Sequence, residues 1–171
     1  MTDPLDAIAD QVGNKKRNFD APPLHLWHPD LSGEIPIRIA RDGTWYHDGD
    51  PIRRESLRNL FASILRRESD GEYYLVTPAE KWHLAVEAHP LIVTDVEQEG
   101  NDLRLTLNTG RSVTVGEEFP LFLDKALDNV AVVKLWHGLT ALFSRNAWYR
   151  LVELADSDSA VSSGGVTFRL A

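Results

Sequence analysis

The clearest structural signal in the chain is the stretch Ile35-Pro36-Ile37-Arg38-Ile39-Ala40-Arg41-Asp42-Gly43-Thr44-Trp45-Tyr46. Its isoleucines recur at every second position, which is the period of a strand that buries one face. Asp42-Gly43 follows, and this dipeptide favours the positive backbone dihedral angles of a tight hairpin turn. The stretch therefore predicts two antiparallel strands joined at residues 42 and 43.

A helical pattern comes next. Asp48-Gly49 predicts a second turn, after which apolar residues recur at helical spacing. These residues are Leu57, Leu60, Phe61, Ile64 and Leu65. Arg66 would lie at the end of this helix, Gly71 would stop it, and Tyr73–Val76 is predicted to form a strand.

From Trp82 onward, alternation with a period of two predicts short antiparallel strands. The candidates are Trp82–Val86, Leu91–Val96, Leu103–Leu107, Val113–Val115, Leu121–Leu123 and Val130–Leu135. Leu139–Leu154 is predicted to be helical, with Ser144 as an internal cap or kink. Strands followed by one C-terminal helix indicate the α+β class. The serine-rich tail from Asp156 is expected to be flexible, although Val166–Leu170 could add an edge strand.

These patterns divide the 171 residues into four parts. We expect an N-terminal appendage at 1–19 with a short helix over 3–12, an α+β subdomain at 20–78, a second subdomain at 79–155, and a flexible tail at 156–171. Leu57-x-x-Leu60-Phe61 recurs as Leu139-x-x-Leu142-Phe143, a weak internal repeat. Duplication is one interpretation of it, and chance similarity of two amphipathic helices is the other.

Composition excludes several classes of protein. The 18 basic and 26 acidic residues give a net charge of −8, which disfavours binding to polyanionic nucleic acid. No run reaches the roughly 18 apolar residues of a membrane span, and the first residues lack the basic start and apolar core of a secretory signal. The absence of cysteine excludes thiolate metal sites and cysteine nucleophiles. We therefore expect a soluble cytoplasmic protein that binds neither a nucleic acid polymer nor a membrane.

The familiar motifs of enzymes are absent from the sequence. It has no Gly-x-Ser-x-Gly elbow, no Walker loop and no Gly-x-Gly-x-x-Gly. His25-x-x-His28 is a candidate metal pair, but the neighbouring prolines keep it extended, so its side chains are expected to point apart. The other histidines, His47, His83, His89 and His137, are isolated along the chain. We therefore expect no catalytic residue, no metal and no cofactor, with a hydrolase of unrecognised geometry as a competing interpretation.

Arginine and aromatic residues are the remaining candidates for a site. Arg38 projects from the strand face opposite the isoleucines, and Trp45 and Tyr46 follow the turn. A guanidinium can bind phosphate or carboxylate at two points, and an aromatic face can stack on a planar base. The alternative is structural, because surface arginines usually form weak ion pairs and tryptophans usually fill cores. The residues alone leave both interpretations open.

Two blocks of the sequence are distinctive, together with Pro23–Trp27. They are Ile37-Arg38-Ile39-Ala40-Arg41-Asp42-Gly43-Thr44-Trp45 and Tyr74-Leu75-Val76-Thr77-Pro78-Ala79-Glu80-Lys81. In these blocks the chain resembles the bacterial family named domain of unknown function 1285, and the likeness extends over residues 20–155. The sequence departs from the expected pattern at Arg53-Arg54-Glu55 and at His28, which could alter the rim of a pocket.

The resemblance implies two small α+β subdomains related by duplication, the second a pleckstrin-homology-like barrel closed by a helix. It also implies a binding site between them for a nucleotide-like ligand, and a role in signalling. No reaction is implied. The candidate ligand-binding residues are Trp27, Arg38, Asp42, Trp45, Arg54, Arg66, Thr77, Glu80 and Lys81.

Each candidate has an expected role in the leading hypothesis, which is a non-enzymatic sensor of a small anionic or nucleotide-like ligand. The three arginines would bind anionic oxygens, the two tryptophans would offer flat apolar walls, and Glu80 with Lys81 would orient polar groups or hold the hinge. The alternative is a protein-interaction module. It would present to a protein partner an edge strand of the C-terminal barrel or a surface around Trp136 and Trp148.

Overall fold

The computed structural model describes residue 8 and residues 23–171. The chain divides into two compact units, unit 1 at Met1–Ala88 and unit 2 at His89–Ala171, so the boundary lies later than the expected residue 78. The helix predicted over residues 3–12 lies outside the described residues, apart from Ile8, which is buried. Within the described part of the chain, no helix has the length and apolar character needed to cross a membrane.

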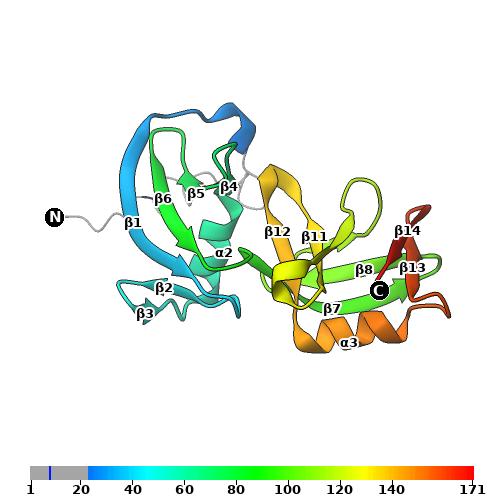
Figure 1. Ribbon diagram of the computed structural model, residues 1–171. Coiled ribbons are helices and arrows are strands. Elements are labelled where there is room, and N and C mark those ends of the chain that lie inside the picture. The colour runs from blue at the N-terminus through cyan, green and yellow to red at the C-terminus, as the bar shows by residue number, and fades with distance from the viewer. Residues whose placement is uncertain (1–7, 9–22) are drawn as a thin grey trace. The chain divides into compact units, whose positions relative to one another are not determined.

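Unit 1 is built on a six-stranded mixed sheet (Figure 1). Its elements are η2 (Leu24–Leu26), β1 (Leu31–Ile39), β2 (Trp45–His47), β3 (Asp50–Pro51), α2 (Glu55–Ser63), β4 (Leu65–Arg67), β5 (Tyr73–Val76) and β6 (Lys81–Val86). The strand order is β3-β2-β1-β6-β5-β4. Two antiparallel meanders are thus joined through the parallel pair of β1 and β6.

The predicted hairpin between β1 and β2 is confirmed. The amide of Ala40 donates to the carbonyl of Thr44 at 2.8 Å, and the amide of Gly43 donates to the carbonyl of Ala40 at 2.9 Å. Gly43 has a φ of 91°, a conformation that glycine adopts readily because it has no β-carbon. The three isoleucines of β1 are buried and Arg38 between them is exposed, as their alternation predicts.

The helix of unit 1 is shorter than predicted. It ends at Ser63, and the chain then enters β4, which the apolar spacing places inside the helix. Leu65 is buried and pairs with Leu75 of β5. Pairing between strands decides the conformation here, because a short apolar run fits either a helix or a strand. Arg66 consequently projects from a strand and not from the end of a helix.

Unit 2 has the same strand order as unit 1. Its elements are β7 (Leu91–Glu99), β8 (Asp102–Leu107), β9 (Ser112–Thr114), β10 (Leu121–Asp124), η3 (Lys125–Leu127), β11 (Val130–Lys134), η4 (Trp136–Gly138), β12 (Thr140–Phe143), α3 (Arg145–Glu153), β13 (Ala160–Ser163) and β14 (Val166–Arg169). The order β10-β11-β12-β7-β8-β9 again joins two meanders through a parallel pair, β7 with β12. The described strands form an open sheet, so the expected barrel is not closed.

The predicted C-terminal helix is half strand. Leu139 is followed by strand β12, and the helix α3 begins only at Arg145. Ser144 is its N-cap, since its hydroxyl oxygen accepts from the amide of Ala147 at 3.2 Å. The motif at Leu57–Phe61 therefore lies in a helix and the one at Leu139–Phe143 lies mainly in a strand, so the two are not equivalent. The two units do share a strand order, but the repeated Leu-x-x-Leu-Phe motif does not mark equivalent positions in them.

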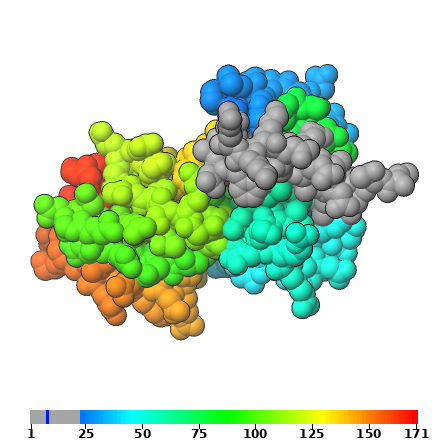
Figure 2. All heavy atoms as spheres, turned by 180° about the vertical axis from the view of Figure 1, so that it is seen from behind, coloured from blue at the N-terminus to red at the C-terminus, as the bar shows by residue number. Residues whose placement is uncertain are grey.

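The tail expected to be flexible is a hairpin. Val166–Arg169 is a strand, as one interpretation suggested, but its partner is β13. Ser163 is buried, where its hydroxyl oxygen accepts from the amide of Leu103 at 2.7 Å and donates to the carbonyl of Val115 at 2.6 Å. In Figure 2 the hairpin, drawn in red, lies beside the yellow-green residues that precede β10. These bonds fix the tail to the sheet of unit 2.

Candidate functional site

Side-chain alternation gives the sheet of unit 1 two different faces. One face is buried and carries Ile35, Ile37, Ile39, Trp45, Leu65, Leu75 and Leu84. The other, here called the polar face, carries Glu34, Arg38, Tyr46, Arg66, Tyr74, Lys81 and His83, which the strand register places on neighbouring strands. Three of the six charged candidate residues, Arg38, Arg66 and Lys81, therefore lie on one side of one sheet.

Arg66 is held by protein partners on this face. Its Nη1 donates to the carbonyl of Leu24 at 3.1 Å and to that of Trp27 at 2.9 Å, and its Nη2 donates to Glu68 Oε2 at 2.5 Å. The side chain is only 12% exposed. Lys81 Nζ donates to the other oxygen of Glu68 at 2.9 Å. Arg66 thus fastens η2 to the sheet, and both cations already have an anionic partner.

Tyr74 extends this network. Its hydroxyl donates to Asp70 Oδ2 at 2.5 Å; this bond raises the pKa of Tyr74 to about 12 and lowers the pKa of Asp70. Burial by itself would raise the pKa of Glu68, but the hydrogen bonds from Lys81 and Arg66 outweigh it and lower that pKa. The network therefore stabilises ionised carboxylates and a neutral phenol.

The charge around β4, β5 and β6 does not favour an anion. On the polar face, Arg66 and Lys81 stand against four carboxylates, Glu34, Glu68, Asp70 and Glu72. Arg67, the next residue of β4, lies on the opposite face. The polar face therefore has two more negative than positive charges here. Like charges in a partly buried site repel strongly. This end of the polar face is a structural network in its own right.

Arg38 lies in a different setting. Its guanidinium carbon is 4.3 Å from the centroid of the Tyr46 ring, and its Nη1 donates to Glu87 Oε1 at 2.6 Å. The other oxygen of Glu87 accepts from the amide of Arg41 at 2.9 Å. The Arg38 side chain is 45% exposed, and its Nε and Nη2 donate to no group among the described residues. Arg38 can therefore offer two donors to a ligand.

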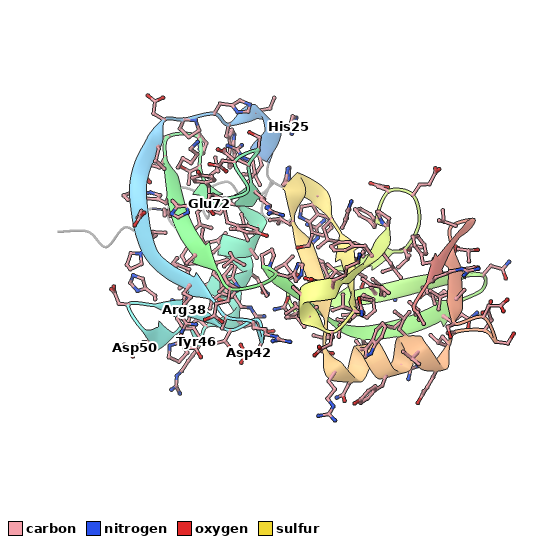
Figure 3. All side chains as sticks on the ribbon, viewed as in Figure 1. His25, Arg38, Asp42, Tyr46, Asp50 and Glu72 are labelled. Atoms are coloured by element: carbon pink, nitrogen blue, oxygen red, sulfur yellow. The ribbon has the colours of Figure 1, made fainter. Side chains whose placement is uncertain are left out.

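The structure separates Arg38 from Arg66. Arg38 aligns with Ala85 of β6, whereas Arg66 aligns through Tyr74 with His83. Three strand spacings of about 4.8 Å and two residues of about 3.3 Å put their backbones roughly 16 Å apart. Figure 3 shows the same division, with Arg38, Tyr46 and Asp42 at one end of the sheet and Glu72 toward the other. The two arginines do not converge on one phosphate group.

Three other predicted residues have local structural roles. Asp42 Oδ1 accepts from the amide of Thr44 at 3.0 Å in the hairpin turn, and this bond lowers the pKa of Asp42. The buried hydroxyl of Thr77 accepts from the amides of Ala79 and Glu80 at 3.3 and 3.0 Å. Trp45 is buried in the core, so it offers no exposed wall to a ligand.

The remaining predicted residues are only partly consistent with a ligand site. Trp27 is half-buried, and its carbonyl accepts from Arg66. Arg54 is exposed at the start of α2, which it does not cap with its side chain. Glu80 is half-buried in the turn before β6. Trp27, Arg66 and Lys81 therefore gather around one network, and Arg38 and Asp42 lie elsewhere.

Two residues at the Arg38 end were not among the nine candidate ligand-binding residues, although Tyr46 is one of the aromatic residues noted after the turn. Tyr46 pairs with Arg38 across the hairpin. A two-residue turn at Asp42-Gly43 would have paired Arg38 with His47 instead, but the loop also contains Arg41, since Ala40 bonds to Thr44. Glu87 is 49 residues from Arg38 along the chain, so no local pattern could have indicated their contact.

Unit 2 contains a partly buried polar cluster around His89, a histidine that looked isolated in the sequence. His89 Nδ1 lies 2.7 Å from Thr140 Oγ1, and its Nε2 lies 2.7 Å from Asp124 Oδ2. A hydroxyl, an imidazole and a carboxylate bonded in this order also occur in nucleophilic triads. Here, however, the hydroxyl belongs to Thr140, which is buried within β12 and is not open to a substrate. Among the described residues, no group of three or more His, Cys, Asp or Glu side chains could hold a metal ion.

The fold and the polar face define a two-unit α+β protein. The family model described as domain of unknown function (DUF1285), N-terminal domain, matches residues 22–89. The model described as protein of unknown function (DUF1285), C-terminal domain, matches residues 84–170. The chain belongs to the DUF1285 family, and the resemblance seen in the two sequence blocks is confirmed.

Two solved structures of this family are similar to the chain. A DUF1285 family protein from Silicibacter pomeroyi DSS-3 is 37% identical, with a TM-score of 0.86 over 99% of this chain and 95% of that one. A DUF1285 family protein from Shewanella baltica OS155 is 27% identical, with a TM-score of 0.58 over 70% of this chain and 91% of that one. No curated protein matches the sequence.

Proposed function

We propose that this chain is a non-enzymatic binding protein that takes a small anionic or nucleotide-like ligand on Arg38 and Tyr46 of unit 1. The observation that carries the proposal is the exposed guanidinium of Arg38, which lies over the Tyr46 ring with Nε and Nη2 available. A guanidinium held against an aromatic ring is pre-organised for two-point contact with a phosphate or a carboxylate.

Glu87 marks the position that an anion could take. Its carboxylate accepts from a side-chain donor of Arg38 and from the backbone amide of Arg41, a combination that suits other anions equally well. Both Arg38 and Glu87 are nearly half exposed, and such pairs contribute only about 0–1 kcal/mol. A ligand phosphate could therefore displace Glu87 or bind to the donors that Glu87 leaves.

This proposal is narrower than the one drawn from the sequence. Arg66 and Lys81 belong to the neutralising network of Glu68, and Trp45 is buried, so none of them is included among the ligand contacts. Arg38 is retained, and Tyr46 is added. In the signalling role that the family resemblance implied, binding of the ligand would be the input that the protein senses.

The test compares two matched arginines. Thermal shift and calorimetry would be run with inorganic phosphate and with nucleoside mono-, di- and triphosphates on wild type, Arg38→Ala and Arg104→Ala. Arg104 is a suitable control because it is 46% exposed and pairs with Glu99 in unit 2. A ligand at 100 times its Kd should stabilise wild type and the control by about 2.7 kcal/mol and Arg38→Ala by much less. Equal responses of all three proteins would remove Arg38 from the site.

A second candidate function is recognition of a protein through unit 2. In the described residues β10 pairs only with β11, so its outer edge is available for strand addition. Trp136 is half-buried, and the centroid of its ring lies 4.0 Å from the guanidinium carbon of Arg111. Because Arg111 covers this ring, the edge of β10 is the better candidate for contact with a protein partner. A partner captured by wild type and by Arg38→Ala, but not by Leu123→Pro, would support this function.

A further inference from the structure

A short flap connects β10 to β11 in unit 2. The flap comprises η3 and the next two residues, Asp128 and Asn129, whose φ angles are 58° and 59°. Left-handed backbone costs energy at residues other than glycine and persists where surrounding contacts hold it. A single 3-10 turn adds little stability of its own. The closed flap therefore depends on the contacts that its side chains and its ends make.

One of these contacts is apolar. Leu127 packs against a cluster of buried residues, Ile92, Val132 and Leu142, together with Phe122 and Val130. The three buried residues lie side by side on β7, β12 and β11. The flap thus covers apolar side chains of the sheet, which would gain solvent exposure if it moved away.

Two hydrogen bonds of the flap are accepted by Asp124. Its Oδ1 accepts from the amide of Ala126 at 3.0 Å, and its carbonyl accepts from the amide of Asn129 at 2.9 Å. The start and the end of the flap are consequently bonded to the same residue. The bond to Ala126 depends on the side chain of Asp124, so a group that fixes this side chain also holds the start of the flap.

His89 fixes that side chain. Its Nε2 bonds to Asp124 Oδ2, and its Nδ1 bonds to Thr140 Oγ1, each at 2.7 Å. The ring is 11% exposed and lies 6.4 Å from the ring of Phe122. A neutral imidazole can donate from Nε2 while it accepts the Thr140 hydroxyl at Nδ1, and both bonds are satisfied together. His89 therefore ties the flap to β12.

We propose that His89 is the latch of this flap: its bond to Asp124 holds Lys125–Asn129 closed over the apolar cluster, and loss of that bond lets the flap open while the sheet stays paired. The device works inside unit 2. It does not depend on a ligand at Arg38, so it can hold or fail independently of the proposed function.

The test is amide hydrogen exchange on the full chain. In His89→Ala the amides of Ala126 and Asn129 should exchange about tenfold faster or more, the effect expected when a hydrogen bond to a charged group is lost. The matched control is His83→Ala, which removes a half-buried histidine beside Glu34 and Glu72 in unit 1. It should leave the exchange of the flap unchanged.

A second variant keeps the test decisive if His89→Ala does not fold. Asp124→Ser keeps a side-chain oxygen that can accept from the amide of Ala126 and the carbonyl for Asn129, but it removes the carboxylate oxygen that His89 binds. We expect faster exchange in the flap and wild-type exchange at Leu105 and Val113. Flap amides that exchange at the wild-type rate would overturn the proposal. Uniform acceleration throughout unit 2 would overturn it as well, because His89 would then support the whole unit.

Discussion

The two sheets of this protein share a strand order. They differ in the side chains on the sheet face opposite the main core, which are charged in unit 1 and apolar in unit 2. In unit 1 that face carries the charged network of Arg66, Glu68 and Lys81. In unit 2 the central strands are buried on both sides, and Ile92, Val132 and Leu142 form an apolar cluster under the flap. One backbone framework thus supports either chemistry, because the strand hydrogen bonds leave the side chains free to vary.

The largest expected effect concerns the apolar cluster of unit 2. Leu142→Ala should lower the free energy of unfolding by about 2–5 kcal/mol, because it removes buried methyl groups and leaves a cavity. Urea unfolding followed by circular dichroism measures this loss. Val152→Ala, at an exposed position of α3, is the control. Similar losses in the two variants would show that the cluster does not contribute as a core.

The polar side of the comparison is tested by Arg66→Ala. This change removes the donors that the carbonyls of Leu24 and Trp27 and one oxygen of Glu68 accept. We expect a loss of about 1–3 kcal/mol, since buried acceptors are left without a partner. Arg67→Ala, at the exposed neighbouring position, should cost less in the same urea titration. The reverse ranking would contradict the structural role of Arg66.

A pH titration sharpens the comparison further. The pKa of Tyr74 is raised to about 12 from 10.0, so the stabilisation from its bond to Asp70 is complete below about pH 10. It is lost as the pH rises from there toward 12, because the unfolded chain ionises first. Phenolate absorbance should show that the late titration of Tyr74 in wild type moves to lower pH in Asp70→Asn. An unchanged titration in the variant would exclude this bond as the cause.

The smallest effect is expected at Arg38. Arg38→Ala should change the free energy of unfolding by no more than about 1 kcal/mol, because the pair with Glu87 is exposed. Arg104→Ala should behave alike, since the two arginines have nearly equal exposure. A much larger loss at Arg38, measured by urea unfolding, would make it a structural residue like Arg66.

Local pattern was enough for several elements of the fold. The alternation of Ile35, Ile37 and Ile39 predicted β1, Asp42-Gly43 predicted the hairpin, and Tyr73–Val76 is strand β5 as expected. Two helix predictions were wrong, at Leu65–Arg67 and Leu139–Phe143, where a run of apolar positions at helical spacing extends beyond the helix itself. Their strand conformation depends on partners elsewhere in the chain, and a period read within the run cannot reveal those partners.

The candidate site shows the same division. The strand period put Arg38 on the face opposite the isoleucines, and this position is confirmed. The sequence could not assign Arg66 to Glu68 and two backbone carbonyls, since its strand was itself assigned to a helix. It also treated His89 as isolated, although Asp124 and Thr140, 35 and 51 residues away, are its partners.

The amino-acid order by itself determined the α+β class, the main hairpin and the family, because these follow from short-range periodicity, turn chemistry and two specific blocks. Only the tertiary structure decided which charged groups neutralise one another and which stay available. Strand register brings together residues that are tens of positions apart, and a charged side chain changes its role with the partner it meets. Arg38 and Arg66 have the same chemistry, and only their neighbours make one exposed and the other structural.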